Sequence, residues 1–483
     1  MIQSLFYILV MLFPAVGLIA GFSAAVIVPI WLLTILIALS DKIFINLPYA
    51  TIKKTLLSKW KLEILFALWC LVTNFYSLNY PASLLNYLQV FLIVLIGFIV
   101  NSHIDKLPIN VSKIKIYFIL GIVVAIALFF IEYSSHGIIT RTFRAIFQPK
   151  SSGQFFLFIL DRGCSLLSVL SWLLIAILIL YHKYLLALIY YLLIFYLLSI
   201  SDSLASFLAF TIGGLVFLTN RLLASKSLQS IFLKLFTFAM ITSSIMMPII
   251  AYKIQPHYAS DHYAKFLPDS AKHRVFIWHF VAEQIIKKPI LGYGFASSRN
   301  FKIDKEQMVS YHQWTWSPFP LHPHNNIMQI LFETGLIGLI LFLSLIYKYI
   351  QKISNISLVQ SPKSAKMNLT GKEIDIDTLN YKSVAYACFI NYYIIGMISF
   401  NIWQIWWVCS AFGAVILLKL LLRRATTNCH CEEPLYSQLL KVRRGSGFRY
   451  LPSLREDRRS TKQSIKITKN GLLRRLTPPR NDV

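Results

Sequence analysis

A histidine-rich segment followed at fixed spacing by glycines is the most specific chemical feature of the sequence. His324-Asn325 is followed after nine residues by Gly335 and after two more by Gly338. Because the ordinary pKa of histidine lies near neutral pH, such a ring can accept the proton of an attacking hydroxyl group. The candidate residues are the general base His324 and five supporting residues, namely His322, Asn325, Glu333, Gly335 and Gly338.

A simpler interpretation exists for each of these residues. A histidine at the end of a membrane span is commonly an interfacial hydrogen-bonding residue, and small residues let a neighbouring helix approach closely. We accept that packing role for Gly335 and Gly338, which would help to place His324 without acting in the chemistry. A carboxylate inside a span, such as Glu333, is costly and must find a structural or functional partner.

Three arginines in segments predicted to face outward could bind phosphate groups. Arg162 precedes an apolar run, and Arg274 and Arg299 lie before and after the glycine-containing turn Pro289 to Gly294. Guanidinium groups bind phosphate oxygens in bidentate fashion and stabilise a charged leaving group without a metal. These three arginines are therefore candidate phosphate ligands, with no metal and no cofactor expected. The alternative is that they pair with lipid headgroup phosphates.

The composition places these residues in a polytopic membrane protein. Of the 483 residues, 57% are hydrophobic and only 14% are charged, and the mean hydropathy is +0.62. A soluble domain would carry about a quarter charged residues. The apolar runs do not alternate as barrel strands do, so the fold class is all-α. The formal charge of +27 is the one expected from basic cytoplasmic loops, and no nucleic-acid partner is predicted.

The apolar windows predict about twelve transmembrane helices. The windows span residues 4–22, 24–40, 62–78, 84–100, 114–131, 164–181, 184–200, 203–219, 231–251, 327–347, 384–400 and 402–422. Most short basic gaps then fall on one side, which places both termini in the cytoplasm. Two outer segments, about 132–163 and 252–326, carry basic residues against this rule and are predicted to hold the site.

The predicted domains follow from these windows. Residues 1–251 hold helices one to nine, 252–326 form a long periplasmic loop, and 327–422 hold the last three helices with a cytoplasmic linker at 348–383. Residues 423–483 form a basic tail that we expect to be disordered. Within the long loop, an amphipathic helix should begin after Pro268, capped by Asp269 or Ser270, bury Val275, Trp278, Ala282 and Ile285, and end before Pro289.

Over residues 1–422 the sequence resembles the O-antigen ligase family and its wider superfamily of lipid-linked glycan polymerases. The resemblance rests on His324-Asn325 with Gly335 and Gly338, Glu333, the 289–294 turn, the span layout and the Asp161-Arg162-Gly163 step. It implies a metal-independent, inverting glycosyltransferase of the bacterial inner membrane, with its active site facing the periplasm. The donor would be a glycan linked to undecaprenyl pyrophosphate, with Arg162, Arg274 and Arg299 binding the pyrophosphate. The acceptor would be lipid A-core, in lipopolysaccharide synthesis.

Two other functions stay open. A polymerase of the same superfamily would use a second lipid-linked glycan as acceptor, and the Asp-Arg step before the sixth span favours a ligase only slightly. A polysaccharide transporter should have ionisable residues at the midplane, broken helices and paired halves. The spans here carry little charge away from their ends and show no internal repeat, which favours an enzyme.

Overall fold

The computed structural model describes residues 2–44, 59–107, 109–147, 155–223, 226–355, 366–369 and 372–421. These residues are predominantly helical. The predicted basic tail, residues 423–483, lies outside the described residues.

Each of the twelve predicted windows falls on a long helix of the described chain. These helices are α1 (Ile2–Ile19), α2 (Ala24–Phe44), α4 (Lys61–Asn74), α5 (Tyr80–His103), α6 (Val111–Ser134), α8 (Asp161–Leu180), α9 (Tyr184–Ser199), α10 (Leu204–Leu222), α11 (Lys226–Lys253), α14 (Asn326–Ser354), α15 (Ile376–Ile398) and α16 (Ile405–Leu421). Within the described part, seven helical segments are long and apolar enough to cross a membrane. The chain is a multi-pass membrane protein.

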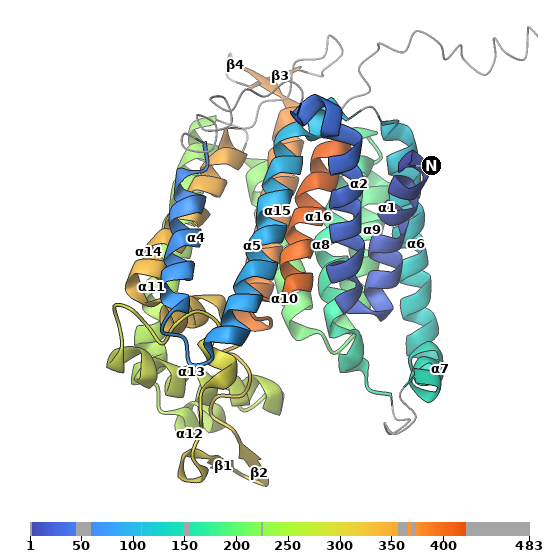
Figure 1. The fold of residues 1–483 in the computed structure, drawn as a ribbon. Coiled ribbons are helices and arrows are strands. Elements are labelled where there is room, and N and C mark those ends of the chain that lie inside the picture. Colours follow the sequence, from blue (N-terminus) through green and yellow to red (C-terminus); the bar gives the residue numbers. More distant parts are fainter. Residues whose placement is uncertain are drawn as a thin grey trace, which may run out of the picture. The chain divides into compact units, whose positions relative to one another are not determined.

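The helices stand side by side, with α8 in their middle (Figure 1). In the apolar 18-residue window of the span that contains α8, 89% of the residues are buried, and α8 contacts α1, α9, α15 and α16. Trp172 of α8 packs against Phe210 of α10 with ring centroids 5.2 Å apart. Since lipid tails are as apolar as these side chains, such close packing is what holds helices together in a bilayer.

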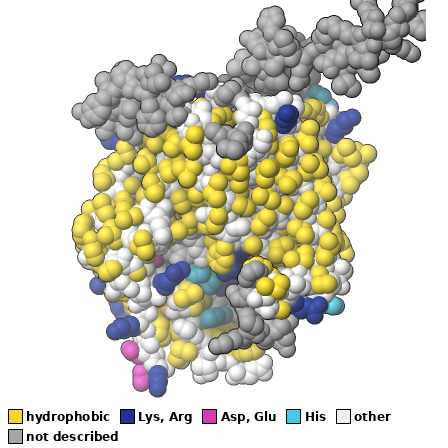
Figure 2. Space-filling view, turned by 45° about the vertical axis from the view of Figure 1, so that its right-hand side comes forward, with side chains coloured by type: hydrophobic (Ala, Val, Ile, Leu, Met, Phe, Trp, Pro, Cys, Tyr) yellow, Lys and Arg dark blue, Asp and Glu magenta, His cyan; other side chains and the backbone are white. Residues whose placement is uncertain are grey.

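Hydrophobic side chains cover the middle of the face seen in Figure 2, and Lys, Arg and His gather toward its two ends. Many large apolar residues on this and other surfaces are exposed, among them Leu85, Leu188 and Ile340. On a soluble protein so much exposed apolar surface would be a liability. Against lipid it is the expected surface.

The long segment between α11 and α14 has its own structure. Its elements are α12 (Pro256–Tyr258), the π-helix η4 (Ala259–Tyr263), α13 (Asp269–Lys287), the 3-10 turns η5 (Ser297–Asn300) and η6 (Lys305–Gln307), and the antiparallel hairpin of β1 (Val309–Tyr311) and β2 (Trp314–Trp316). The predicted bounds of α13 are confirmed. No side chain caps its start, however, and its buried face is centred on Ile277, Val281 and Ile285, while Val275 and Trp278 are only half-buried.

Two other segments differ from the expected loops. In the first outer segment, Ile138–Phe147 form helix α7, whose N-terminal end is capped by the buried Glu132 carboxylate through the backbone N–H groups of Ile139 and Thr140. In the predicted linker 348–383, α14 continues to Ser354, and β3 (Lys366–Leu369) pairs with β4 (Lys372–Asp375). α15 begins at Ile376, before residue 384, where its apolar window starts. The first turns of this helix are polar, so a search for apolar windows does not include them.

Candidate active site

Helix α14 is broken at Gly335, and this break anchors the turn at 289–294. Gly335 has φ 66° and ψ −169° inside the otherwise helical segment, a conformation open essentially to glycine alone. The break frees backbone groups that a continuous helix would use internally. Three hydrogen bonds to the turn use them: Tyr293 N–H to Phe332 O (2.8 Å), Gly294 N–H to Glu333 O (2.8 Å) and Leu336 N–H to Pro289 O (2.9 Å).

The two glycines of the sequence motif therefore have different roles. Gly338 is a packing position as predicted, because Trp69 of α4 approaches it and donates its indole N–H to the Thr334 carbonyl at 2.9 Å. Gly335 does more than allow packing: a side chain there would collide with the backbone at Ile290. Both residues act on the framework of the site.

Glu333 is fully buried and accepts hydrogen bonds from three segments of the chain. Its carboxylate accepts hydrogen bonds from the backbone N–H groups of Ala296 and Ser298, the Ser298 hydroxyl, the Gln329 amide and the Trp403 indole. A buried carboxylate is tolerated only when it is satisfied in this way. Glu333 thus fixes η5, which carries Arg299, against α14 and the turn before α16.

The histidine segment is fastened to the end of α15 through one carbonyl group. His324 Nδ1 lies 2.7 Å from the Ser399 carbonyl oxygen, and His322 Nε2 lies 3.2 Å from the same atom. Since a carbonyl oxygen only accepts, both of these ring nitrogens carry hydrogen. In the neutral rings, the nitrogen with a free lone pair is therefore Nε2 of His324 and Nδ1 of His322.

Neighbouring contacts hold this segment in an unusual conformation. His324 has φ 53°, which costs energy for a residue other than glycine and marks a position fixed by its surroundings. Trp278 of α13 donates its indole N–H to the Pro323 carbonyl at 3.0 Å. Asn325 is the N-cap of α14, and its side chain accepts from Met328 N–H at 3.0 Å. The supporting role predicted for Asn325 is consistent with this cap.

The predicted arginines and histidines lie within electrostatic reach of one another. Burial, together with the smaller effects of the positive charges of Arg299, Arg274 and Arg162, lowers the pKa of His322 to about 4. Burial also lowers the pKa of His324 to about 3, with smaller effects from His322 and Arg274. These residues come from α8, α13, η5 and the segment before α14, so the fold brings distant parts of the sequence together.

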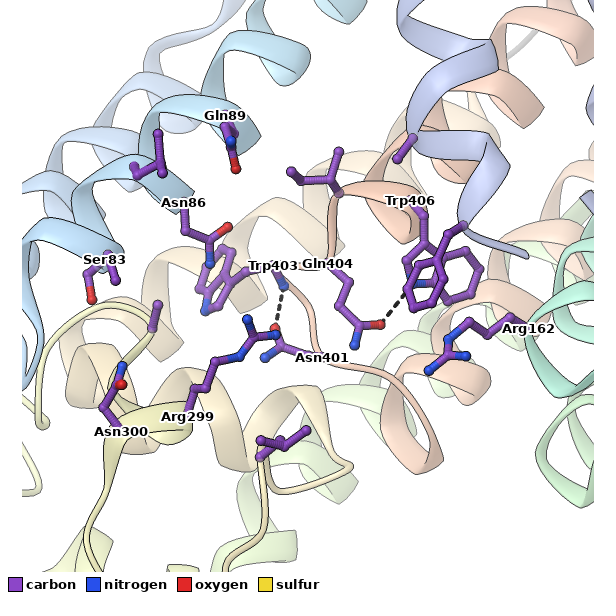
Figure 3. Close-up of a pocket in the computed structure, with 17 residues that line it drawn as sticks. Ser83, Asn86, Gln89, Arg162, Arg299, Asn300, Asn401, Trp403, Gln404 and Trp406 are labelled. Atoms are coloured by element: carbon purple, nitrogen blue, oxygen red, sulfur yellow. Dashed lines mark hydrogen bonds between the residues drawn. The ribbon is translucent and has the colours of Figure 1, made fainter. Parts of the chain in front are cut away.

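Arg162 projects from the first turn of α8 into a cavity of about 620 Å³ that Arg299 also lines (Figure 3). Gly21 and Gly163 allow the end of α1 to approach α8 here, since a Cβ at either position would collide with the facing chain. Phe22 follows Gly21, and its ring lies 4.2 Å from the Arg162 guanidinium carbon, a cation–π contact.

Arg274 lies on α13, beside the histidines. Burial lowers the pKa of its guanidinium group, and the charge of Asp161 opposes that shift. Asp161, the residue before Arg162, accepts a hydrogen bond from the Ser203 hydroxyl. The sequence analysis used Asp161 only as part of the Asp161-Arg162-Gly163 step, although its position next to Arg162 could have suggested a partner for the arginines.

Sequence reasoning also missed the turn between α15 and α16. This turn supplies the Ser399 carbonyl for both histidines, and Asn401 and Gln404 for the cavity wall. The available signal was the presence of polar amides in a very short gap between two apolar runs. Phe22 carried no signal, because an aromatic residue at a span end is commonplace.

Comparisons with known proteins agree with this arrangement. The sequence model of a family described as O-Antigen ligase matches residues 189–343. The chain is 44% identical over 435 residues to a protein of Rickettsia felis, covering 87% of this chain and 98% of the relative. It is 43% identical over 434 residues to a protein of Rickettsia bellii, covering 86% and 98%. Both relatives carry the name "Putative polysaccharide ligase". The chain belongs to the O-antigen ligase family.

Proposed function

We propose that the protein is a glycosyltransferase that moves a glycan from undecaprenyl pyrophosphate to lipid A-core on the periplasmic face of the bacterial inner membrane. The observation that carries this proposal is the convergence of Arg162, Arg274 and Arg299 on His322 and His324, beside a cavity of about 620 Å³. Cations for a leaving phosphate and a nitrogen lone pair for a hydroxyl proton are the two groups that such a transfer requires. The names of the relatives favour a ligase over a polymerase.

The proposed topology has twelve membrane spans with both termini in the cytoplasm. Residues 252–326 then face the periplasm, together with the first turn of α8 and the turn between α15 and α16. The positions of the basic gaps support this orientation. It places His324 at the depth of the lipid headgroups, where the pyrophosphate of a lipid carrier would lie.

In the proposed reaction, the acceptor hydroxyl oxygen attacks the anomeric carbon of the donor sugar and the bond from that carbon to the pyrophosphate oxygen breaks. The arginines stabilise the charge on the departing pyrophosphate. Nε2 of His324 accepts the hydroxyl proton, while Nδ1–H stays bonded to Ser399 O. A single displacement of this kind inverts the anomeric configuration and needs no enzyme nucleophile.

The electrostatics suggest when His324 can act as a base. The pKa of His324 is lowered to about 3, so its affinity for a proton is low. A bound pyrophosphate brings negative charge that offsets the nearby guanidinium groups, and this raises the histidine pKa toward neutral pH. Donor binding would therefore raise the proton affinity of His324 and make it a stronger base.

A transfer assay with the purified full-length protein tests the proposal. The assay contains a glycan-linked undecaprenyl pyrophosphate and purified lipid A-core, and it compares the wild type with His324→Ala. A heavier lipopolysaccharide formed by the wild type alone supports the ligase. Chains that lengthen on the lipid carrier, with lipid A-core untouched, would instead show a polymerase. If no product forms with active donor and acceptor, the transferase is rejected in favour of a transporter.

A further inference from the structure

The turn between α15 and α16 contributes a second kind of ligand to the cavity that Arg162 and Arg299 line. Asn401 and Gln404 belong to this turn and line the cavity. In the view of Figure 3, Gln404 lies between the two arginines and Asn401 lies beside Arg299. The question is which chemical group these neutral amides would bind.

The orientation of each amide is set by a protein donor. The Asn401 Oδ1 atom accepts from Trp403 N–H at 2.7 Å, and the Gln404 Oε1 atom accepts from the Trp406 indole N–H at 3.0 Å (dashed in Figure 3). A flipped amide would place its NH2 group against these donors, so the assignment is determined. Among the described residues, neither NH2 group has a hydrogen-bond acceptor. Asn401 is only 8% exposed and lines the cavity, so a ligand in the cavity could accept from its NH2 group.

The backbone adds to the same wall. Gln404 is the N-cap of α16, since its carbonyl accepts from the N–H groups of Trp407 (2.9 Å) and Val408 (3.0 Å). The first two residues of α16, Ile405 and Trp406, also line the cavity. The N-terminal end of a helix carries partial positive charge and favours an anion.

The turn therefore offers two amide NH2 groups as free donors, while each amide oxygen already accepts one hydrogen bond from the protein. Sugar hydroxyl groups both donate and accept, whereas the oxygens of a pyrophosphate diester only accept. We propose that Asn401 and Gln404 are ligands of the donor's pyrophosphate, bridging the space between Arg162 and Arg299. This inference rests on the proposed function, because it names further residues of the same donor site.

Neutral donors have a specific advantage at this position. A further lysine or arginine would bind the same oxygens, but its charge would lower the proton affinity of His322 and His324 still more. An amide stabilises the phosphate oxygens through directed hydrogen bonds and adds no net charge. The turn can thus strengthen donor binding without weakening the base that the same reaction needs.

The test is the binding of glycan-free undecaprenyl pyrophosphate to the purified full-length protein in detergent. Gln404→Leu removes the amide donor and should raise the Kd at least about tenfold, because a hydrogen bond to a charged oxygen is lost. Gln404→Glu keeps an oxygen for the Trp406 indole but replaces the NH2 group, and it should weaken binding further through like-charge repulsion. The matched control is Gln89→Leu, a position on α5 that lines the same cavity and lies apart from both arginines in Figure 3. Its Kd should change less than about twofold.

Four results would overturn the inference. Unchanged binding by Gln404→Leu would show that the amide is no ligand, and unchanged binding by Gln404→Glu would show that only its oxygen matters, as a support for Trp406. An equal rise in Kd for Gln89→Leu would show that binding depends on the general polarity of the cavity and not on the amide of Gln404 itself. A loss seen only with a glycan-bearing donor would assign the amides to sugar. Transfer by the wild type, measured alongside, tests the proposed function separately.

Discussion

Nδ1 of His324 lies 2.7 Å from the carbonyl oxygen of Ser399, so the turn after α15 determines which nitrogen of the ring can accept a proton. The free lone pair is on Nε2, and the peptide carbonyl keeps it there because Nδ1 must donate. A histidine held in this way can act as a base, or it can be a fastener between two segments. These roles predict different mutant behaviour.

His324→Ala should lower kcat for transfer by about 100-fold or more if the ring accepts the hydroxyl proton. His324→Asn should lose as much activity, although its amide can still donate to Ser399 O. Membrane content and melting temperature in detergent should stay near those of the wild type in the Asn variant. Recovery of most activity in His324→Asn would contradict the base and leave only the fastening role.

The pH dependence follows from the low histidine pKa. In the free protein the pKa of His324 is lowered to about 3, so the neutral ring persists as the pH falls through 6.5. The acid limb of kcat/KM, which reports the free enzyme, should therefore lie below about pH 5. The acid limb of kcat should lie at higher pH, because bound pyrophosphate offsets the guanidinium charges.

Removing one guanidinium charge tests whether these charges lower the pKa of the histidines. Arg274→Gln removes a positive charge that lowers the pKa of both histidines, so the acid limb of kcat/KM should move to higher pH. A limb at pH 6.5 in the wild type, unmoved in Arg274→Gln, would show that the histidines are not under this electrostatic control.

Chelation tests the prediction that cations of the protein stabilise the leaving group. Dialysis against EDTA should leave transfer unchanged, because three guanidinium groups supply the positive charge. The measurement is the rate of lipopolysaccharide formation before and after dialysis, with added Mg²⁺ as the comparison. Loss of activity that Mg²⁺ restores would defeat the account based on arginines alone.

Much of the helical framework could be predicted from the sequence because each helix needs its own apolar run. Prolines made α13 predictable too, since Pro268 and Pro289 flank it. The buried face of α13 was less predictable. Its real face is decided by contacts with α11 and α14, which are remote in sequence.

The charged candidates for the site could be named from the sequence, but their arrangement could not. Guanidinium groups characteristically bind phosphate and imidazole groups transfer protons, so Arg162, Arg299 and His324 could be chosen as candidates from the sequence. The break at Gly335 could not be foreseen, because glycines three residues apart fit close helix packing equally well. Gln404 is neutral and common, and only its place between two arginines gives it significance.

The break in α14 makes a stability prediction. Gly335→Ala should destabilise the protein by more than about 2 kcal/mol, because alanine resists this backbone conformation and its Cβ would collide with Ile290. Gly338→Ala is the graded control, since its backbone is helical and the nearest atoms belong to the Thr334 side chain. Melting temperatures in detergent should fall more for Gly335→Ala. An equal fall in both variants would mean that packing alone sets the cost.

The contact between Phe22 and Arg162 allows a prediction about the orientation of the Arg162 side chain. The ring is 57% exposed, so it contributes little to core packing, yet it lies against the guanidinium group at 4.2 Å. Nε of Arg162 is buried, with no hydrogen-bond partner among the described residues, so we expect the ring to help orient this side chain toward the cavity.

Phe22→Leu should therefore raise the KM for the donor by about two- to fivefold, the worth of an exposed cation–π contact, with kcat changed less. Phe22→Tyr keeps the aromatic face and should behave as the wild type. In an Arg162→Ala background, Phe22→Leu should have no further effect, because the ring acts through the guanidinium group. An additive loss in that double variant would mean that Phe22 contacts the donor itself, since a positioning residue has no effect once the residue it positions is gone.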